Sequence, residues 1–459
     1  MLDAALPEGT LSPPEPRHLE EPRGRYHGQA GTVARPRSTG EVSTILAACN
    51  AAQVPVIPYS GGTGLVGGQL TEGGPAPVLL SLERMTAIRA VDPLDNTLTC
   101  EGGTILADIQ AAAEGVDRLF PLSLASEGSC RIGGNLATNA GGVNVLRYGN
   151  TRDLCLGVEA VLADGTVVQG LKRLRKDNTG YDLRHLLIGS EGTLGVITAA
   201  TLRLFPRPAE QATALCALRD LDAALELLNA TQKACGETLS AFELMERTGF
   251  EMLAEKLPQI PVPLESPGAW NVLIDLGGSG VSEALERVLE TAFEDELITD
   301  AVLAQNEAQR YTIWQIREQI PEANRLIGSI VSNDISVPVS SVPSFVRAAG
   351  QKLRAFDDSI RINAFGHLGD GNLHYNLFPA QGRSRDSYDN ARSALKEIVT
   401  EEVMRHEGSF SAEHGVGRLK VAELEHYGDP GKLAAMRAIK AALDPNGILN
   451  PGAVLAGSP

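Results

Sequence analysis

The sequence has 459 residues, more than one hydrophobic core usually supports, and its 43% hydrophobic and 21% charged residues exclude a largely disordered chain. Its net charge of -17 argues against nucleic acid or an anionic membrane surface as a partner, because both would repel it. No apolar run approaches the roughly 20 residues that cross a bilayer, and no signal-peptide pattern opens the chain, so we expect no membrane span and a cytoplasmic location.

The first half of the chain is expected to form an N-terminal arm and a strand-rich α+β domain. Residues 1–25 lack periodicity and predict an arm that is poorly ordered or draped over the fold. A capping-box signal at 38–41 predicts a helix that leads into a strand at 54–58. From 78 to 204, apolar stretches between glycine turns predict several strands and few, short helices.

A second domain is predicted beyond the double proline of FPRPAE at 205–210. There the pattern predicts helices at 220–234, 282–294, 306–325, 343–356 and 386–406, and strands at 270–276, 298–304 and 330–337. We interpret this alternation as helices packed on one face of an antiparallel sheet. The expected division is an arm at 1–25, a first domain at 26–208, a second domain at 209–427 and a returning segment at 428–459.

Three glycine-rich segments of the first domain indicate a backbone-lined ligand site. PYSGGTGLVGGQ at 58–69 follows a predicted strand, so its N–H groups can converge on a pyrophosphate, although it lacks nicotinamide-binding and P-loop spacing. EGSCRIGGNLATNAGG at 127–142 adds amides and hydroxyls suited to a planar ligand, and GSEGTLGVIT at 189–198 is similar. One such segment could be a surface loop, but three in one domain favour binding.

GHLGDGNLHYN at 366–376 sets two histidines around an Asp-Gly turn. A two-residue hairpin at 370–371 would place His367 opposite His374, with Cβ atoms ~5 Å apart and both imidazoles able to reach one ion. Asn376 would point the same way. Glu413 and His414, in SAEHGVG, offer a carboxylate and a further imidazole. The histidine pair alone is more often structural, but its combination with Glu413 favours a metal site.

These segments, with RYGN, LGVEAVLADGTVV and NTGYDLRHLLIGSEGTLGVIT, resemble the vanillyl-alcohol-oxidase-type flavoproteins over residues 30–455. The most similar branch is the FAD-linked D-2-hydroxyacid dehydrogenase family, which includes D-2-hydroxyglutarate dehydrogenase, D-lactate dehydrogenase and the glycolate oxidase flavoprotein subunit. The resemblance implies an α+β fold, with a PCMH-type (vanillyl-alcohol-oxidase-like) FAD-binding domain and an α+β substrate, or cap, domain containing an antiparallel sheet.

The resemblance also implies which residues bind the cofactor. The residues expected to bind FAD are Ser60, Gly61, Gly62, Thr63, Gly64, Leu65, Gly67, Gly68, Pro121, Gly128, Ser129, Gly134, Asn135, Thr138, Asn139, Gly142, Gly192, Ile197 and Asn450. Relatives with covalent flavin carry a histidine after the Gly-Gly pair, whereas this chain has Thr63. We therefore expect a non-covalent, dissociable FAD.

For the second domain the resemblance implies a divalent metal, with zinc expected, bound by His367, His374 and Glu413. A D-2-hydroxy acid would reach the cation through its carboxylate and C2 hydroxyl. His414 would act as the general base and contact the substrate while the C2 hydride passes to flavin N5, giving a 2-oxo acid. Asn376 would bind the substrate. Arg317 would pair bidentately with its carboxylate, the alternative being a solvated helix arginine.

The chain departs from members that resemble D-2-hydroxyglutarate dehydrogenase at two positions. Those members tend to carry a threonine four residues after the arginine and a lysine just upstream of the DISVP strand, where this chain has Pro321 and Ser332. Losing the lysine removes a cation that could meet a distal carboxylate. D-2-Hydroxyglutarate, D-lactate and D-malate are therefore all candidate substrates.

Two other functions stay open from the sequence alone. A metallohydrolase would use the two histidines and Glu413 but would leave the glycine segments without a purpose. A non-catalytic electron-transfer subunit would hold FAD without being reduced by any hydroxy acid. For the dehydrogenase we expect an electron acceptor such as an electron-transfer flavoprotein, a quinone or a cytochrome, no nucleic-acid partner, and a homodimer as one candidate assembly.

Overall fold

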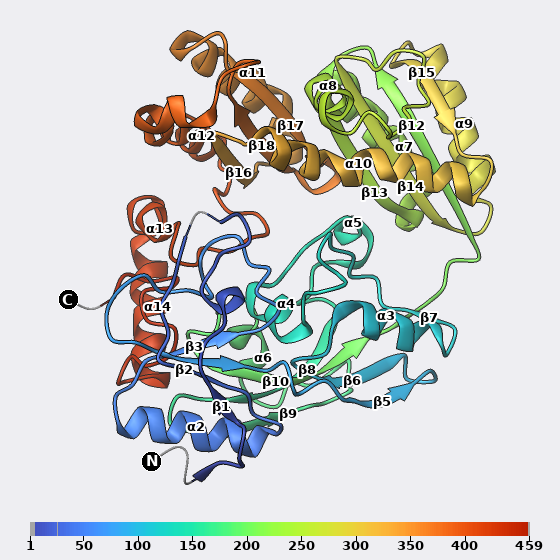
Figure 1. Cartoon of the computed structure of the whole chain (residues 1–459). Coiled ribbons are helices and arrows are strands. Elements are labelled where there is room, and N and C mark those ends of the chain that lie inside the picture. The colour runs from blue at the N-terminus through green and yellow to red at the C-terminus, as the bar shows by residue number, and fades with distance from the viewer. Residues whose placement is uncertain (1–4, 25, 458–459) are drawn as a thin grey trace. The chain divides into compact units, whose positions relative to one another are not determined.

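The computed structural model describes residues 5–24 and 26–457, and the chain divides into two compact units (Figure 1). The first unit consists of the chain up to Gly142, Gly149–Arg207 and the segment from Glu413 onwards. The second unit consists of Val143–Tyr148 and Pro208–Ala412. The return at Glu413 precedes the boundary expected at 427, and the sequence pattern did not separate residues 143–148 from the first domain.

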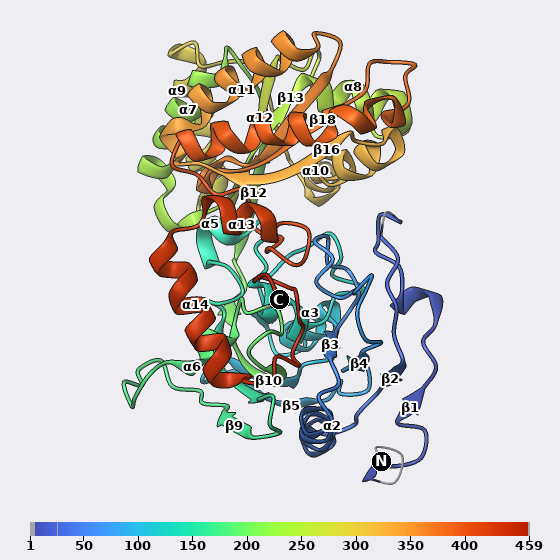
Figure 2. The same ribbon diagram turned by 90° about the vertical axis from the view of Figure 1, so that its left-hand side faces the viewer.

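The first unit contains two main sheets. In the four-stranded sheet, β1 (Leu11–Ser12) pairs antiparallel with β2 (Thr32–Ala34), and β4 (Val78–Ser81) runs parallel to β2 and β3 (Val56–Tyr59). Figure 2 shows β1 beside β2, so the N-terminal arm contributes a strand. The antiparallel five-stranded sheet has the order β5 (Ile88–Asp92), β6 (Thr97–Glu101), β10 (Val196–Arg203), β8 (Cys155–Val161) and β9 (Val167–Gly170).

Helix α2 (Thr39–Ala51) shows how local sequence builds this unit. Its N-cap Ser38 accepts a hydrogen bond from the Glu41 amide at 3.2 Å, which satisfies one of the donors left open at a helix start. Its buried side chains, including Ile45 and Leu46, pack on residues of β3, β4 and β8. The other helices of the unit are α3 (Leu106–Glu114), α4 (Ile132–Thr138), α6 (Leu183–Leu187), α13 (Val421–Tyr427) and α14 (Pro430–Leu443).

The second unit is built on one antiparallel sheet of seven strands, as the sequence predicted for this domain. In order they are β15 (Ile298–Leu303), β12 (Glu210–Leu218), β14 (Trp270–Gly278), β13 (Leu239–Glu246), β17 (Arg361–His367), β18 (Asn372–Phe378) and β16 (Val331–Ser336). The helices are α5 (Val145–Tyr148), α7 (Leu221–Cys235), α8 (Arg247–Lys256), α9 (Val281–Glu294), α10 (Glu307–Ile327), α11 (Val342–Phe356) and α12 (Arg392–Arg405).

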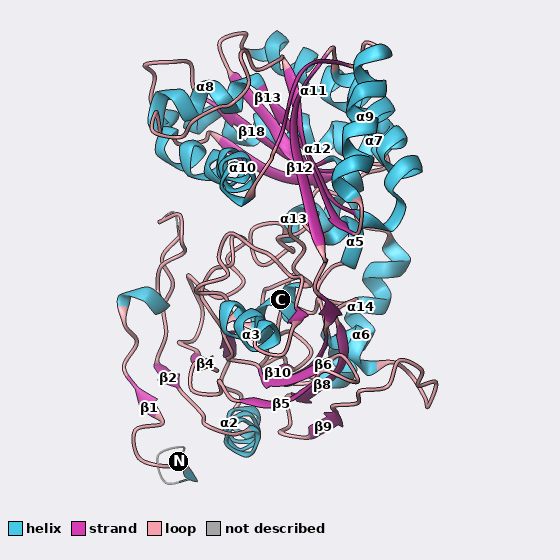
Figure 3. Ribbon diagram, turned by 90° about the vertical axis from the view of Figure 1, so that its right-hand side faces the viewer, coloured by secondary structure: helices cyan, strands magenta, loops and turns pink. Residues whose placement is uncertain are grey.

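The expectation that helices cover only one face of this sheet is wrong. Figure 3 shows α8 and α10 on one side and α7 and α9 on the other. Strand β12 explains why: Ala214 and Cys216 lie in one hydrophobic cluster and Leu215 and Ala217 in a second, because alternate residues point to opposite faces. Strands buried on both faces read as continuous apolar runs, and for that reason β12 and β13 were not predicted.

No helix among the described residues is long and apolar enough to cross a membrane. All six cysteines are unpaired, and five of them are buried, which is typical of structural thiols.

The carboxyl group of Glu246, at the end of β13, accepts a hydrogen bond from the Ala364 amide at 2.9 Å. Burial raises its pKa to about 7, and nearby Arg354 opposes that rise. The folded-state pKa therefore lies above the ordinary value of 4.5. The fold favours the neutral carboxyl. Its contribution to the free energy of unfolding is therefore complete below the ordinary pKa and is lost as the pH rises through about 7.

We expect Glu246→Gln to stabilise the protein at alkaline pH, because an amide still accepts from Ala364 but cannot ionise. The free energy of unfolding should rise by ~1 kcal/mol at about pH 8.5, roughly 2–4 °C in Tm for a domain of this size, and by less at about pH 6. Thermal unfolding at the two pH values measures the difference. A variant less stable than the wild type at the higher pH would contradict this reading.

Candidate functional site

The hairpin β17–β18 carries both histidines, but its register differs from the expected one. Phe365, and not His367, lies opposite His374. The turn is wider than two residues because 368–370 form a 3-10 turn, closed by the Gly371 amide, which donates to the Leu368 carbonyl at 3.2 Å. The expected His367–His374 cross-strand pair is therefore wrong. The two imidazole rings nevertheless lie close together, with centroids 5.7 Å apart.

His367 is positioned by its other neighbour, strand β13. Its cross-strand partner there is Glu243, whose Oε1 lies 2.6 Å from Nδ1 of His367. The second oxygen of Glu243, Oε2, accepts a hydrogen bond from Nε of Arg317 at 2.8 Å. Burial disfavours the charged form of Glu243, but the neighbouring His367 and Arg317 outweigh it and hold its pKa at about 2. The carboxylate is thus an anion shared by two side chains.

Arg317 lies on α10 and is only 5% exposed, which excludes a solvated helix arginine. Its guanidinium stacks over the ring of Phe365, with Cζ 5.0 Å from the ring centroid. Among the described residues, the Arg317 guanidinium makes one hydrogen bond to the protein, from Nε to the Glu243 carboxylate. Its bidentate pairing with a substrate carboxylate, expected from the resemblance, stays a prediction, and only the terminal amino groups can take part in it.

His374 and Asn376 occupy alternate positions of β18 and so face the same side of the sheet. Nδ1 of His374 lies 3.9 Å from Oδ1 of Asp334 on β16, and the same oxygen accepts from Nδ2 of Asn372 at 2.9 Å. Oδ1 of Asn376 accepts from the Asn333 amide at 3.2 Å. The predicted metal ligand His374 thus lies near a carboxylate, and the predicted substrate ligand Asn376 is held by a backbone amide.

Sequence reasoning missed Glu243, Asp334 and Asn372. The signal that could have found Glu243 is the stretch SAFELME, in which one carboxylate interrupts apolar residues. A charge in such a strand has to be paired when it is buried, so an isolated acidic residue inside an apolar run points to a cation or an imidazole opposite it.

In the first unit, two of the glycine segments line one cavity of ≈ 570 Å³. Ser60, Gly61 and Gly62 come from the loop after β3, and Gly128 and Ser129 come from the segment before α4. Arg131, which the sequence analysis did not select, also lines this cavity and donates to the Gly103 carbonyl.

The two segments contact each other so closely that side chains would not fit between them. The Gly134 amide donates to Oγ of Ser60 at 3.1 Å. A Cβ atom at Gly134 would lie 2.8 Å from Ser60 Oγ, and one at Gly61 would lie 2.6 Å from the Ser129 carbonyl oxygen. The glycines are therefore required by the close approach of the two backbone segments, and glycine-rich backbone of this kind can bind a pyrophosphate.

Gly67 and Gly68 lie apart from this cavity. Their carbonyl groups accept from Nη1 of Arg418 at 3.1 and 3.0 Å. Asn450 bonds to the same residues: its Oδ1 accepts a hydrogen bond from Arg418 at 2.7 Å. Its Nδ2 donates to the carbonyl of Gly68 at 3.0 Å and to the carbonyl of Glu191 at 2.8 Å. Asn450 thus connects three segments that are distant in the sequence.

The other predicted cofactor residues are distributed as follows. Thr63, Gly64 and Leu65 are half-buried in the loop after β3, and Pro121 is buried. On or just after α4, the hydroxyl of Thr138 donates to the Gly134 carbonyl at 3.0 Å, Asn135 is buried, and Oδ1 of Asn139 accepts from the Arg152 amide at 3.0 Å. Gly192 lies against Pro58, and Ile197 is 4% exposed in β10.

Glu413 and His414 belong to the first unit, where the chain re-enters it. Oε1 of Glu413 accepts a hydrogen bond from the Gly142 amide at 2.6 Å. His414 is half-buried. Gly142, expected at the flavin, therefore holds the carboxylate of the predicted third metal ligand.

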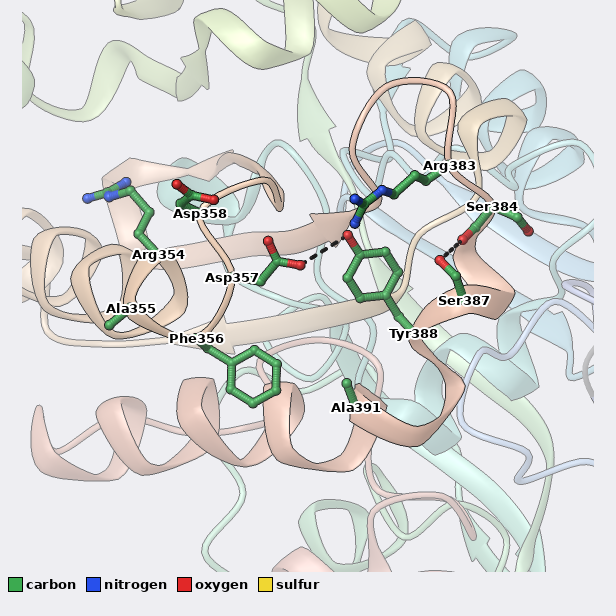
Figure 4. Close-up of a pocket in the computed structure, with 10 residues that line it drawn as sticks. All are labelled: Arg354, Ala355, Phe356, Asp357, Asp358, Arg383, Ser384, Ser387, Tyr388 and Ala391. Carbon is green, nitrogen blue, oxygen red and sulfur yellow. Dashed lines mark hydrogen bonds between the residues drawn. The ribbon is translucent and has the colours of Figure 1, made fainter.

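A hollow of ≈ 850 Å³ on the second unit lies between the end of α11 and residues 383–391 (Figure 4). Its polar side chains contact their own neighbours: the hydroxyl of Tyr388 donates to Oδ2 of Asp357 at 3.3 Å, and that of Ser387 donates to the Ser384 carbonyl at 2.7 Å. The predicted site residues do not line it, and we assign it no role.

Comparison with known families decides the identity of this scaffold. The model for the C-terminal domain of FAD linked oxidases matches residues 207–454, and the model for an FAD binding domain matches residues 30–170. The chain belongs to the FAD-linked oxidase family. Two of the three glycine segments of this FAD-linked oxidase, at 58–69 and 127–142, lie within the matched FAD binding domain. The protein is an FAD-dependent oxidoreductase.

Individual relatives agree with that assignment. D-2-hydroxyglutarate dehydrogenase of Arabidopsis thaliana is 37% identical over 94% of this chain and 76% of its own length. A D-2-hydroxyglutarate–pyruvate transhydrogenase of Saccharomyces cerevisiae is 34% identical, covering 93% and 87%. Among solved structures, p-cresol methylhydroxylase superimposes with a TM-score of 0.77 at 17% identity, covering 99% of this chain and 96% of that one. The expected PCMH-type fold is confirmed.

Gly134→Ala tests whether the contact between the glycine segments forms the cofactor site. The new methyl group would push Ser60 away and open the cavity, so we expect FAD affinity to fall by about tenfold or more, ~1.4 kcal/mol. Flavin absorbance per protein after gel filtration measures it. Gly31→Ala is the matched control, because its Cβ would meet atoms only at 3.6 Å. Equal flavin content in the two variants would refute the assignment.

Proposed function

We propose that the protein oxidises a D-2-hydroxy acid to the corresponding 2-oxo acid. The observation that carries this proposal is the pair of adjacent imidazoles, His367 bonded to Glu243 and His374 near Asp334, in a chain that also contains an FAD-binding domain. Relatives named as D-2-hydroxyglutarate dehydrogenases support the same substrate class.

The chemistry of the donor set fits a divalent metal such as zinc. Ligating histidines usually donate their second ring nitrogen to a carboxylate, and here His367 has Glu243 while His374 lies near Asp334. Glu413 is the third ligand that the family pattern implies. A divalent cation, when bound, would supply a Lewis acid for the substrate hydroxyl and carboxylate.

FAD, when bound, supplies the acceptor for the two electrons and the C2 hydrogen that leave the substrate. Ser60, Gly61 and Gly62 would hold its pyrophosphate through backbone donors, together with Gly128 and Ser129 across the same cavity. Thr63 has no imidazole that could link to the flavin, so the cofactor is non-covalent.

The chain's own residues would orient the substrate and move one proton. The terminal amino groups of Arg317 would pair with a substrate carboxylate, and Asn376 would hydrogen bond to the substrate from the same sheet face as His374. His414 would accept the proton of the C2 hydroxyl, which leaves the electron pair of the C2–H bond to depart as hydride.

Two positions bear on which hydroxy acid is used. Pro321 lies inside α10, one turn beyond Arg317. Ser332 of β16 pairs with Asn376, and its hydroxyl shares a hydrogen bond of 2.7 Å with Ser329. Neither residue brings a cation for a second carboxylate. D-2-Hydroxyglutarate is the first acid to test because relatives are named for it, and D-lactate and D-malate are the other candidate substrates.

The other expectations are unequally supported. A metallohydrolase is disfavoured because family membership gives the glycine segments a purpose. An electron-transfer subunit without catalysis is disfavoured by the oriented histidine pair. The electron acceptor and a homodimer stay predictions. The cytoplasmic location also stays a prediction, and the plant and mammalian relatives are named as mitochondrial proteins.

An anaerobic screen of D- and L-2-hydroxy acids tests the proposal. Flavin absorbance should bleach with at least one D-acid and with none of the matching L-acids, and a chelator should prevent the bleaching. Persistent flavin absorbance with every acid would overturn the proposed reaction. Bleaching that a chelator leaves unchanged would retain the reaction and overturn the metal.

We expect His374→Ala to abolish turnover while the protein keeps its FAD, since His374 belongs to the second unit and the flavin cavity to the first. Removing one of three metal ligands should lower kcat by ~100-fold or more. Flavin content, zinc content and kcat are measured on one preparation, with Glu246→Gln as a control in the same sheet. Loss of flavin together with activity would mean that the hairpin has a structural role only.

A further inference from the structure

The buried carboxylate of Glu243 uses each of its oxygens for a different residue of the candidate site. Oε1 lies 2.6 Å from Nδ1 of His367, and Oε2 accepts from Nε of Arg317 at 2.8 Å. Glu243 is 0% exposed. We propose that Glu243 is a positioning residue that orients the metal-binding nitrogen of His367 and the substrate-facing edge of Arg317 together. This inference rests on the proposed function, to which it adds a coupling between metal and substrate binding.

Glu243 selects the tautomer of His367. An ionised carboxylate accepts hydrogen bonds but cannot donate them, so the proton between Oε1 and Nδ1 must be carried by the imidazole. The lone pair of the neutral ring is then on Nε2. A metal can be bound only through that nitrogen, and Glu243 thereby decides which edge of the ring is the ligand.

The same carboxylate fixes the plane of Arg317. Its Nε–H points at Oε2, and the guanidinium lies over the Phe365 ring with Cζ 5.0 Å from the centroid. These two separate constraints leave a long side chain little rotational freedom. The edge with the terminal amino groups is then presented in one orientation, which suits a planar carboxylate.

An amide in place of the Glu243 carboxylate cannot serve both partners. If the amide oxygen of the Glu243→Gln variant stayed on Arg317, the NH₂ group would face Nδ1 of His367. This would favour the tautomer with the proton on Nε2, and a protonated Nε2 has no lone pair with which to bind a metal. If the oxygen turned to His367, the NH₂ group would face the Nε–H of Arg317, and two donors would meet in a buried place. Glu243→Gln must therefore impair at least one of the two partners, and zinc affinity and KM together report which.

Zinc affinity is the first readout, because it requires no turnover. It is measured on the FAD-loaded protein by competition with a chromophoric chelator. We expect Glu243→Gln to raise the zinc Kd by ~10–100-fold. At saturating zinc, KM for the acid that the wild type oxidises fastest should rise by a larger factor than kcat falls, because Arg317 has lost its orientation.

Two further variants make the result decisive. Glu246→Gln changes a carboxyl on the same strand that bonds to the Ala364 amide instead, and its zinc Kd and KM should stay within ~2-fold of the wild type. Glu243→Asp keeps an acceptor-only group one methylene shorter, and its zinc Kd should fall between those of the wild type and Glu243→Gln.

A folded Glu243→Gln protein with both the zinc Kd and the KM of Glu246→Gln would overturn the inference and leave the proposed function intact. Should Glu243→Gln fail to fold, Glu243→Asp decides, and an unchanged zinc Kd together with an unchanged KM in that variant overturns the inference. A wild-type protein that binds no divalent metal would instead refute the proposed metal site. Near-wild-type flavin content and unfolding temperature identify the folded variants.

Discussion

A carboxylate that is fully removed from water must be compensated by neighbouring charge and hydrogen bonds, and Glu243 meets this requirement with Arg317 and His367. Strand β13 supplies the carboxylate, α10 the guanidinium and β17 the imidazole. Three elements that are distant in sequence are therefore held in one arrangement. The position of His367 therefore depends on this arrangement as well as on the hairpin turn.

The two-sided sheet explains how such a polar cluster can exist inside a core. On β18, Leu373, Tyr375 and Leu377 belong to the hydrophobic cluster beneath α11 and α12, whereas His374 and Asn376 point to the opposite face. Every second residue can thus be polar without weakening the core. Several polar side chains on that face have partners on neighbouring elements, among them Asn372 with Asp334 and Asn363 with Asn324, which lowers the free-energy cost of their burial.

Sequence predicted the fold well where local patterns carry the information. The cap at Ser38, the glycine-rich loops and the amphipathic helices α7, α9 and α11 were found because their determinants lie within a few residues. Strands β12 and β13 were missed because both of their faces are apolar, and a continuous apolar run has no period to detect. The turn after His367 was predicted too short, since Asp-Gly also suits a 3-10 turn that ends in a glycine with φ of 81°.

For the candidate site, sequence could select residue types but not their partners. His367, His374 and Arg317 were chosen from motifs, while the carboxylates that orient them depend on pairing between distant strands. Arg317 was taken for a direct substrate ligand, and the structure adds that one edge of its guanidinium is already bound to Glu243. Such cross-strand partners are not encoded by spacing along the chain.

Anomalous diffraction at the zinc edge, from crystals of the zinc-loaded protein, tests the central claim most directly. The account predicts one strong peak ~2.0–2.1 Å from Nε2 of His367 and at the same distance from a ring nitrogen of His374, with Nδ1 of His367 still on Glu243. A map without a peak between the two rings, or with the metal bound elsewhere, would contradict it.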